Sequence, residues 1–221
     1  MRLITLGLAI AFLAVSPHCL SAQDKKLTLF DGKSLNGWKA EGVTKDKNDG
    51  SPIWTVRDGM IHCAGKGYGF LRYAEKEFGD FHFHLEYRFV KKSGRNNSGI
   101  GIRTVPFDPK KSRDTRPSFA CYEIQLLNDA GKKPDTHCTG SLYRYVAPKE
   151  IAVKPAPEWN EVDIVCVGPR IRISMNGKEI LDFDQTTMKR VKDNPLRGFL
   201  CVQNHGSEIE FRNLWVEEHS K

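Results

Sequence analysis

The sequence predicts an all-β fold made of two antiparallel sheets packed face to face. Short runs that alternate apolar and polar residues recur along the chain between turn residues, which is typical of a sandwich or barrel. No part of residues 23–221 keeps the apolar i, i+3, i+4, i+7 pattern of an amphipathic helix for three turns. Without crossover helices a parallel sheet cannot be connected, so we expect antiparallel pairing.

The clearest strand signal is DFHFHLEYRFV, residues 80–90, in which every second residue from Phe81 to Phe89 is apolar. This period of two predicts a strand with one face in the core. The dipeptides Asn176-Gly177 and Asp58-Gly59 each separate two alternating runs, as the turn of a β-hairpin does. The other strand-like runs are SGIGIRTV, CYEIQLLN, EVDIVCV, RIRISM, KEILDF, GFLCVQN and IEFRNLWVEE.

Residues 1–22 predict a secretory signal peptide. One basic residue precedes an apolar run at positions 3–15, and small and polar residues follow it. The run is too short to span a bilayer, and no later segment is apolar for long enough, so we expect no transmembrane segment. Cleavage after Ser21 or Ala22 would release an exported protein, periplasmic or extracellular. Because no linker or repeat interrupts residues 23–221, we expect one domain there.

The cysteine spacing disfavours a structural zinc site, and the charge distribution disfavours a nucleic-acid-binding surface. The chain beyond the signal peptide contains an odd number of cysteines, so at least one thiol stays unpaired within a chain. They are Cys63, Cys121, Cys138, Cys166 and Cys201. No pair has CxxC spacing, which disfavours structural zinc, and those within strand-like runs are expected to be buried. The charge of +7 concentrates at residues 91–95 and 110–116 without interleaved aromatics, so we expect solvated loops and no nucleic-acid surface.

Eight segments, taken in order, resemble the 3-keto-disaccharide hydrolase family. They are LTLFDGKSLNGW, WTVRDGMI, DFHFHLEYRF, NNSGIGIR, YEIQLLND, TGSLY, EWNEVDIVCVGPRIRISMNGKEI and GFLCVQNHG. The resemblance covers nearly all of residues 23–221. It implies the concanavalin A-like lectin and glucanase fold, an antiparallel jelly-roll β-sandwich whose concave sheet carries the ligand groove.

The resemblance also implies cleavage of an oxidised di- or oligosaccharide or glycoside with a ketone at sugar carbon 3. Such a ketone acidifies the hydrogen on carbon 2, so a base can remove that proton. The enolate then expels the substituent on carbon 1, and water adds to the enone. This chemistry requires a base and a group that stabilises the enolate oxygen. It requires no nucleotide cofactor.

Glu123 and His205 are the candidate catalytic residues. A glutamate inside a half-buried strand usually faces solvent, but the resemblance implies that Glu123 lies in the groove, as the base or as a ligand of a divalent cation. Gln203 and His205 share a face if their strand continues to Gly206. An imidazole titrates near neutrality and suits proton abstraction. Asn204 stands where the family pattern often has aspartate, so no carboxylate is available there.

Gln203 and four further residues are candidates for substrate binding. Arg103 is expected on the face opposite Ile100 and Ile102, where its guanidinium can bind sugar hydroxyls, an enolate oxygen or an acidic neighbour. The other three are Asn97, for amide hydrogen bonds or a turn, Tyr143, for stacking or hydroxyl donation, and Glu86, as a secondary groove residue. Glu86 shares a strand face with two histidines, His82 and His84, but such a row rarely encloses an ion without a partner strand.

Two other functions are open at this point. A conventional glucanase of this fold would need the pattern E-x-D-x-x-E on one strand. Gln125 and Asn128 replace two of those carboxylates, which disfavours ordinary hydrolysis. A non-catalytic carbohydrate-binding module would be favoured by an exposed aromatic platform without titratable groups. We expect Trp38 and Trp159 to pack between the layers instead.

Overall fold

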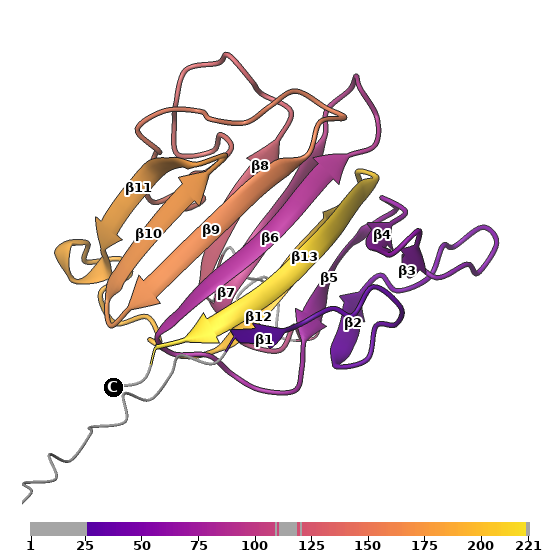
Figure 1. Ribbon diagram of the computed structural model, residues 1–221, viewed down its shortest axis with the longest axis horizontal. Helices are drawn as coiled ribbons and strands as arrows, with labels where there is room; N and C mark the ends of the chain where they lie inside the picture. Colours follow the sequence, from indigo (N-terminus) through magenta and orange to yellow (C-terminus); the bar gives the residue numbers. More distant parts are fainter. Residues whose placement is uncertain (1–25, 109, 111–118, 120, 220–221) are drawn as a thin grey trace, which may run out of the picture.

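The computed structural model describes residues 26–108, 110, 119 and 121–219, and it is a two-layer antiparallel β-sandwich (Figure 1). The predicted all-β jelly-roll fold is therefore confirmed. The expected signal peptide, residues 1–22, lies outside the described residues. Within them, no helix has both the length and the apolar character needed to cross a membrane.

The larger sheet has the strand order β11-β10-β9-β6-β13-β4-β3, and β1 also pairs with β13. Its strands are β1 (Lys26–Thr28), β3 (Trp54–Arg57), β4 (Met60–Cys63), β6 (Phe81–Phe89), β9 (Asn160–Val167), β10 (Arg170–Met175), β11 (Lys178–Asp184) and β13 (Ile209–Glu218). A short 3-10 helix, η2 (Gln185–Thr187), follows β11.

The smaller sheet has the order β2-β5-β12-β7-β8. Its strands are β2 (Trp38–Gly42), β5 (Tyr68–Tyr73), β7 (Asn97–Thr104), β8 (Tyr122–Leu127) and β12 (Phe199–His205). It lies behind the larger sheet in the view of Figure 1, and the inner faces of the two sheets form the core.

β6 shows how the sequence produces this core. Every second residue from Phe81 to Phe89 is buried, and the residues between them are half-buried on the outer face. The predicted alternation is confirmed. The turns at Asn176-Gly177 and Asp58-Gly59 are confirmed as well, because both residues of each turn have the positive φ that a type I′ hairpin needs.

A bulge interrupts the alternation at the end of β7. Cys201 of β12 pairs with Gly101, whereas Phe199 pairs with Thr104, so β7 carries one extra residue over this stretch. Arg103 lies within it and has φ +52°. The bulge therefore changes the side on which the Arg103 side chain emerges.

The expectation that Arg103 lies opposite Ile100 and Ile102 is wrong for this reason. Its side chain is fully buried, and Nη2 donates hydrogen bonds to the carbonyl oxygens of Gly79 at 3.1 Å and Gly168 at 2.8 Å. These two glycines flank β6 and β9 of the larger sheet. Arg103 joins the two sheets at one end of the sandwich and does not face a groove.

The cysteines beyond the signal peptide are all buried and unpaired, as expected for small apolar residues in strands. Burial raises the pKa of the Cys63, Cys121 and Cys166 thiols to about 12. Stability therefore comes from packing and hydrogen bonds among the described residues and not from disulfides. The basic run at residues 91–95 is exposed, as predicted, whereas the run at 110–116 lies outside the described residues except for Lys110.

The two candidate packing tryptophans have different environments. Trp38 is partly buried against the core, donates from Nε1 to the Leu29 carbonyl at 2.7 Å and meets the Tyr73 ring edge-on. Trp159 is not between the layers. It is half-buried and lies between two guanidinium groups, those of Arg88 at 4.8 Å and Arg212 at 4.0 Å from its ring centroid.

The inner and outer faces of β9 provide a test of this architecture. Ile164 is fully buried and Val165, the next residue, is half-buried on the outer face. Ile164→Ala is expected to lower the free energy of unfolding by about 2–5 kcal/mol, because it leaves a cavity between the sheets. Val165→Ala, the matched control, is expected to cost less than about 1 kcal/mol. Urea denaturation measures both, and equal losses would contradict the assigned faces.

Candidate functional site

The outer face of the smaller sheet carries a groove of about 1270 Å³, rich in carboxyl, amide, imidazole and aromatic side chains. Five of the seven predicted site residues line it: Glu123, Gln203, His205, Asn97 and Tyr143. They come from different strands and from the loop after β8. Convergent polar groups in a concave site of this size are typical of ligand binding.

Glu123 lies on the groove side of β8 because its neighbours Tyr122 and Ile124 fill the core. The residue is only 4% exposed. Its carboxyl group crosses over Gly99 of β7, where an added Cβ would lie 2.7 Å from Glu123 Oε1. Glycine at position 99 therefore makes room for the carboxylate to lie against the sheet.

The loop after β8 covers the edge of that strand. Residues 140–143 form backbone hydrogen bonds of 2.8, 2.9 and 3.1 Å with Glu123 and Gln125. This added edge pairing satisfies backbone groups of β8 that water would otherwise solvate. It also brings Tyr143 and the next residue, Arg144, to the groove beside Glu123.

Arg144 is a site residue that sequence reasoning missed. Its φ of +73° turns the chain out of the edge pairing, and its backbone N–H donates to the Thr136 carbonyl at 2.7 Å. The guanidinium lies over the Phe119 ring at 4.2 Å. Its Nη1 is buried without an acceptor among the described residues. One sequence feature could have indicated a role for Arg144: it directly follows TGSLY, one of the segments that resemble the family.

Gln203 is the second unsatisfied group of the groove. The residue is 6% exposed, and Oε1 is buried without a donor in the described part of the chain. β12 extends to His205, so both side chains face the groove as predicted. The His205 imidazole meets the Tyr68 ring edge-on at 4.8 Å, and Tyr68 is 66% exposed at the rim. A ligand hydroxyl could satisfy the Gln203 oxygen.

Gln125 and Asn128, which stand in place of glucanase carboxylates, have structural partners. Gln125 Nε2 donates to Asn97 Oδ1 at 2.7 Å and to the Ser98 carbonyl at 3.2 Å, which orients the Asn97 amide in the groove. Asn128 Oδ1 accepts from the Ala156 backbone at 3.1 Å. The arrangement fits the view that ordinary two-carboxylate hydrolysis is disfavoured here.

Asn204, which replaces the family's frequent aspartate, also has a structural role. It is 1% exposed, donates from Nδ2 to the Lys66 carbonyl at 2.8 Å and accepts from the Gly206 backbone at 3.2 Å. These bonds tie the end of β12 to the loop before β5. The amide therefore holds the chain near His205.

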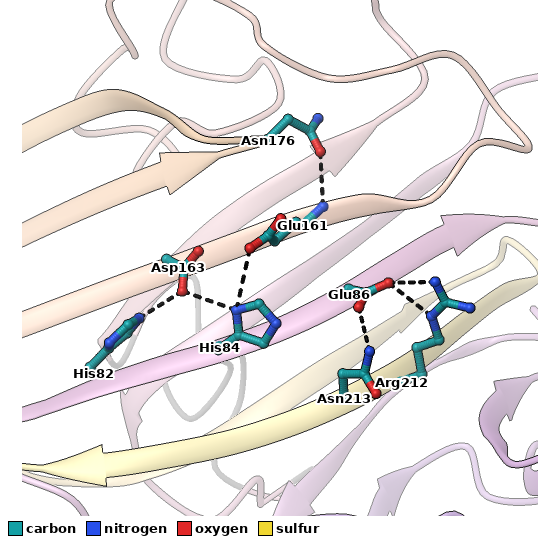
Figure 2. A network of polar contacts seen from close by, with 8 residues as sticks. All are labelled: His82, His84, Glu86, Glu161, Asp163, Asn176, Arg212 and Asn213. Carbon is teal, nitrogen blue, oxygen red and sulfur yellow. Dashed lines mark hydrogen bonds and ion pairs between the residues drawn. The ribbon is translucent and has the colours of Figure 1, made fainter. Parts of the chain in front are cut away.

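Glu86 does not belong to the groove, and the expectation that it does is wrong. It lies on the outer face of the larger sheet, where it accepts two hydrogen bonds from Arg212, at 2.8 and 2.6 Å, and one from Asn213 (Figure 2). Burial raises the pKa of this carboxyl, but the bonds from Asn213 and Arg212 outweigh it and hold the pKa below its usual range. Alternation identifies the outward face of β6 but not the sheet to which the strand belongs.

The described residues contain one group of three His, Cys, Asp or Glu side chains that could hold a metal ion. Its members are His84, Glu161 and Asp163, whose ligand atoms lie within 4.8 Å of one another. They lie on the outer face of the larger sheet (Figure 2), on the side of the sandwich opposite the groove. Glu123 and His205 are not part of such a group.

A buried ion pair lies behind one wall of the groove and holds the residues of that wall in place. Glu41 Oε1 accepts from Arg72 Nε at 3.0 Å and Nη2 at 2.7 Å, and both side chains are 7% exposed. Glu41 Oε2 accepts from the Phe107 backbone at 2.9 Å. The Phe107 ring packs against Phe70, and both rings line the groove. Glu41 therefore fixes β2, β5 and the loop after β7 together.

Comparison with known proteins gives a family match and a relative in sequence. Residues 25–217 match the profile of the 3-keto-alpha-glucoside-1,2-lyase-like domain. A 3-keto-disaccharide hydrolase of Bacteroides thetaiotaomicron is 28% identical over an alignment of 235 positions, gaps included, which covers 88% of this chain and 78% of the relative.

Solved structures show the same fold. A candidate glycosyl hydrolase of Parabacteroides distasonis ATCC 8503 aligns with a TM-score of 0.70 at 23% identity, over 88% of this chain and 94% of the other. The carbohydrate-binding module CBM66 of Bacillus subtilis aligns with a TM-score of 0.53 at 12% identity, over 82% of this chain and 96% of the other. At these identities the likeness concerns the fold alone.

Glu41→Gln tests the wall of the groove. The change leaves the Arg72 charge buried without a counterion, so the free energy of unfolding is expected to fall by about 3–5 kcal/mol. Glu179→Gln is the matched control, because Glu179 is 44% exposed in its pair with Lys149. That change is expected to cost about 0–1 kcal/mol. Urea denaturation separates the two, and a loss for Glu41→Gln no larger than the control's would contradict the assignment.

Proposed function

Because the chain belongs to the 3-keto-alpha-glucoside-1,2-lyase-like family, we propose that it hydrolyses 3-keto-glycosides, including 3-keto-disaccharides, in the groove of the smaller sheet. One observation carries the proposal. The buried carboxylate of Glu123 lies in a groove with an acceptor, Gln203 Oε1, and a donor, Arg144 Nη1, that both lack partners in the described chain. A buried acid between unsatisfied polar groups suits a polar, uncharged ligand.

In the first step Glu123 accepts the proton from sugar carbon 2. The electron pair of the broken C–H bond forms a carbon–carbon double bond, and the ketone oxygen at carbon 3 becomes an enolate oxygen. Of the cationic side chains that line the groove, we assign Arg144 to this oxygen, in place of Arg103, because its Nη1 is buried without an acceptor among the described residues. A fixed guanidinium stabilises developing negative charge because little reorganisation is needed as the reaction proceeds.

In the second step the enolate electrons return to re-form the ketone, and the double bond shifts to carbons 1 and 2 as the bond to the carbon 1 substituent breaks. The leaving oxygen takes a proton from an acid, for which His205 is the candidate on the other side of the groove. Water then adds its oxygen to carbon 1 and returns a proton to His205, and carbon 2 takes a proton from Glu123 after the proton on that carboxyl has exchanged with solvent. One water molecule is consumed, and the products are a free 3-keto sugar and an alcohol.

The register of the strands supports separate roles for Glu123 and His205. Glu123 pairs with Gly101, which pairs with Cys201, so His205 lies four residues further along and two strands across. This corresponds to about 13 Å along and about 10 Å across at the backbone. The hydrogen on carbon 2 and the leaving oxygen on carbon 1 lie close together, so the two side chains must reach toward each other, and the Glu123 carboxyl does so by lying over Gly99. Among the described residues the two side chains form no metal-binding group. We therefore assign Glu123 as the base and not as a ligand of an ion shared with His205.

Amide and aromatic groups would position the sugar. Gln203 Oε1 can accept a hydroxyl hydrogen, and Asn97, held by Gln125, offers its amide to another. Tyr68 is exposed at the rim beside His205 and can cover an apolar sugar face. Tyr143 lines the groove next to Arg144. The predicted signal peptide, residues 1–22, would place this reaction in the periplasm or outside the cell.

A non-catalytic carbohydrate-binding module is the second candidate function. The exposed Tyr68 ring and the fold shared with a carbohydrate-binding module favour it. Such a module would bind the sugar without breaking the bond. It would need no buried carboxylate, which separates it from the first proposal.

The direct test compares 3-keto-trehalose with trehalose as substrates. The purified protein is expected to release sugar from the keto form alone, since the parent sugar lacks the acidic hydrogen at carbon 2. Glu123→Gln is expected to lower turnover by about 10²–10⁴-fold through loss of the base. Glu179→Gln, at an exposed carboxyl, is the matched control. EDTA is expected to leave turnover unchanged, because the assigned residues act directly.

Binding of the keto sugar without any turnover would contradict the proposal and would favour the carbohydrate-binding module. Full activity in Glu123→Gln would instead overturn the role of that residue.

Gly99→Ala tests the position of the carboxylate without removing it. The new methyl group would force Glu123 Oε1 away from its place 2.7 Å from the Cβ position. A displacement of this kind is expected to lower turnover by about 10–100-fold while folding is retained. Gly79→Ala is the control, because its nearest neighbour is a flexible arginine side-chain atom at 3.6 Å. Equal turnover in both variants, measured on the keto sugar, would argue against the proposed geometry.

A further inference from the structure

A second cluster of titratable side chains lies on the outer face of the larger sheet. His82 and His84 of β6 face Glu161 and Asp163 of β9 (Figure 2). His84 and Asp163 are direct partners in the strand register. Because alternate residues of a strand share a face, all four side chains project on the same side. None of them lines the groove that contains Glu123.

The ligand atoms of the cluster already converge. Asp163 Oδ1 accepts from His84 Nδ1 at 3.0 Å and from His82 Nε2 at 2.6 Å. Glu161 Oε1 lies 3.9 Å from His84 Nδ1. Ligands of a tetrahedral ion bound at about 2.0–2.1 Å are separated by roughly 3.3 Å. The atoms are therefore near the spacing that one ion requires.

Packing orients the imidazoles independently of any ion. The Trp215 ring stacks on His84 at 4.9 Å with an angle of 14° between the planes. The same indole meets His82 edge-on at 4.8 Å. Rings that are held by packing lose little freedom when they bind a ligand, which favours affinity.

The charge balance of the cluster also favours a cation. Asp163 Oδ1 accepts hydrogen bonds from two imidazoles, an arrangement that suits a charged carboxylate. The Glu161 carboxyl lies close to it on the same strand face. A dication would balance the two neighbouring negative charges.

We propose that His84 Nδ1, Asp163 and Glu161 bind one divalent transition-metal ion, while His82 orients Asp163 through its hydrogen bond. Zinc fits this donor set, since it accepts imidazole and carboxylate ligands together. Calcium and magnesium prefer sites built from oxygen ligands alone. The Glu161 side chain is 52% exposed, which gives the ion a route from solvent.

The ion would clamp β6 to β9 in the middle of the larger sheet. It would stand in place of the hydrogen bond that now joins His84 and Asp163. Since the cluster and the groove lie on opposite faces of the sandwich, the effect of the metal falls on stability and not on turnover.

The experiment uses the mature full-length protein, free of any affinity tag, dialysed against zinc chloride and assayed for bound metal. One zinc ion per chain is expected. Glu161→Gln and His84→Gln are each expected to weaken binding by more than about 10-fold. Glu161→Gln keeps the hydrogen bonds between Asp163 and both histidines, so it is expected to fold. His219→Ala, at a histidine outside the cluster, is the matched control and is expected to bind as the wild type does.

Thermal unfolding gives a second measurement. Free zinc at about 100 times its dissociation constant is expected to raise the melting temperature by about 5–10 °C in the wild type and in the double variant Glu123→Gln/His205→Ala. Loss of zinc binding in that double variant would place the ion in the groove and overturn the proposal. Wild-type affinity in both Glu161→Gln and His84→Gln, or no zinc bound by the wild type, would overturn it as well.

Discussion

The close approach of the Glu123 carboxyl to Gly99 determines how the rest of the groove is built. A carboxylate on the middle of a strand normally extends into water, but here a neighbouring glycine leaves room for it to lie against the sheet. The loop at residues 140–143 then pairs with the edge of β8 and covers it. Burial of this acid is costly unless polar groups lie near it, and the groove that holds it is also lined by the amides of Gln125 and Gln203 and by Arg144.

The sandwich separates two kinds of chemistry by using the two outer faces of its sheets. The smaller sheet presents Glu123 in a groove suited to a sugar, and the larger sheet presents His84 and Asp163 on an open face. Both arrangements arise from the same alternation, because each strand that sends one row of side chains into the core must send the other row outward. The core residues of β6 and β9 therefore position the metal cluster, while those of β8 and β12 position the groove.

The parts of this structure that follow local rules could be predicted from sequence. The buried row of β6 and the turns at Asn176-Gly177 and Asp58-Gly59 required only alternation and positive φ. The parts that depend on long-range geometry could not. Alternation predicts the wrong side for the Arg103 side chain because a bulge in β7 breaks the alternation.

The sequence pattern also does not predict the sheet to which a strand belongs or the geometry of the loops. The sequence predicts Glu86 in the groove, which is wrong, because alternation gives the face of a strand and not the sheet to which the strand belongs. The sequence does not predict Arg144 in the groove, because its position depends on edge pairing and on its own left-handed backbone conformation in a loop.

The most direct test of the central claim, that Glu123 removes the proton from carbon 2, is turnover of a 3-keto-disaccharide in deuterium oxide. The account predicts deuterium at carbon 2 of the released keto sugar, above the level of an enzyme-free control and absent with Glu123→Gln. A released sugar that keeps its original hydrogen at carbon 2 would contradict it.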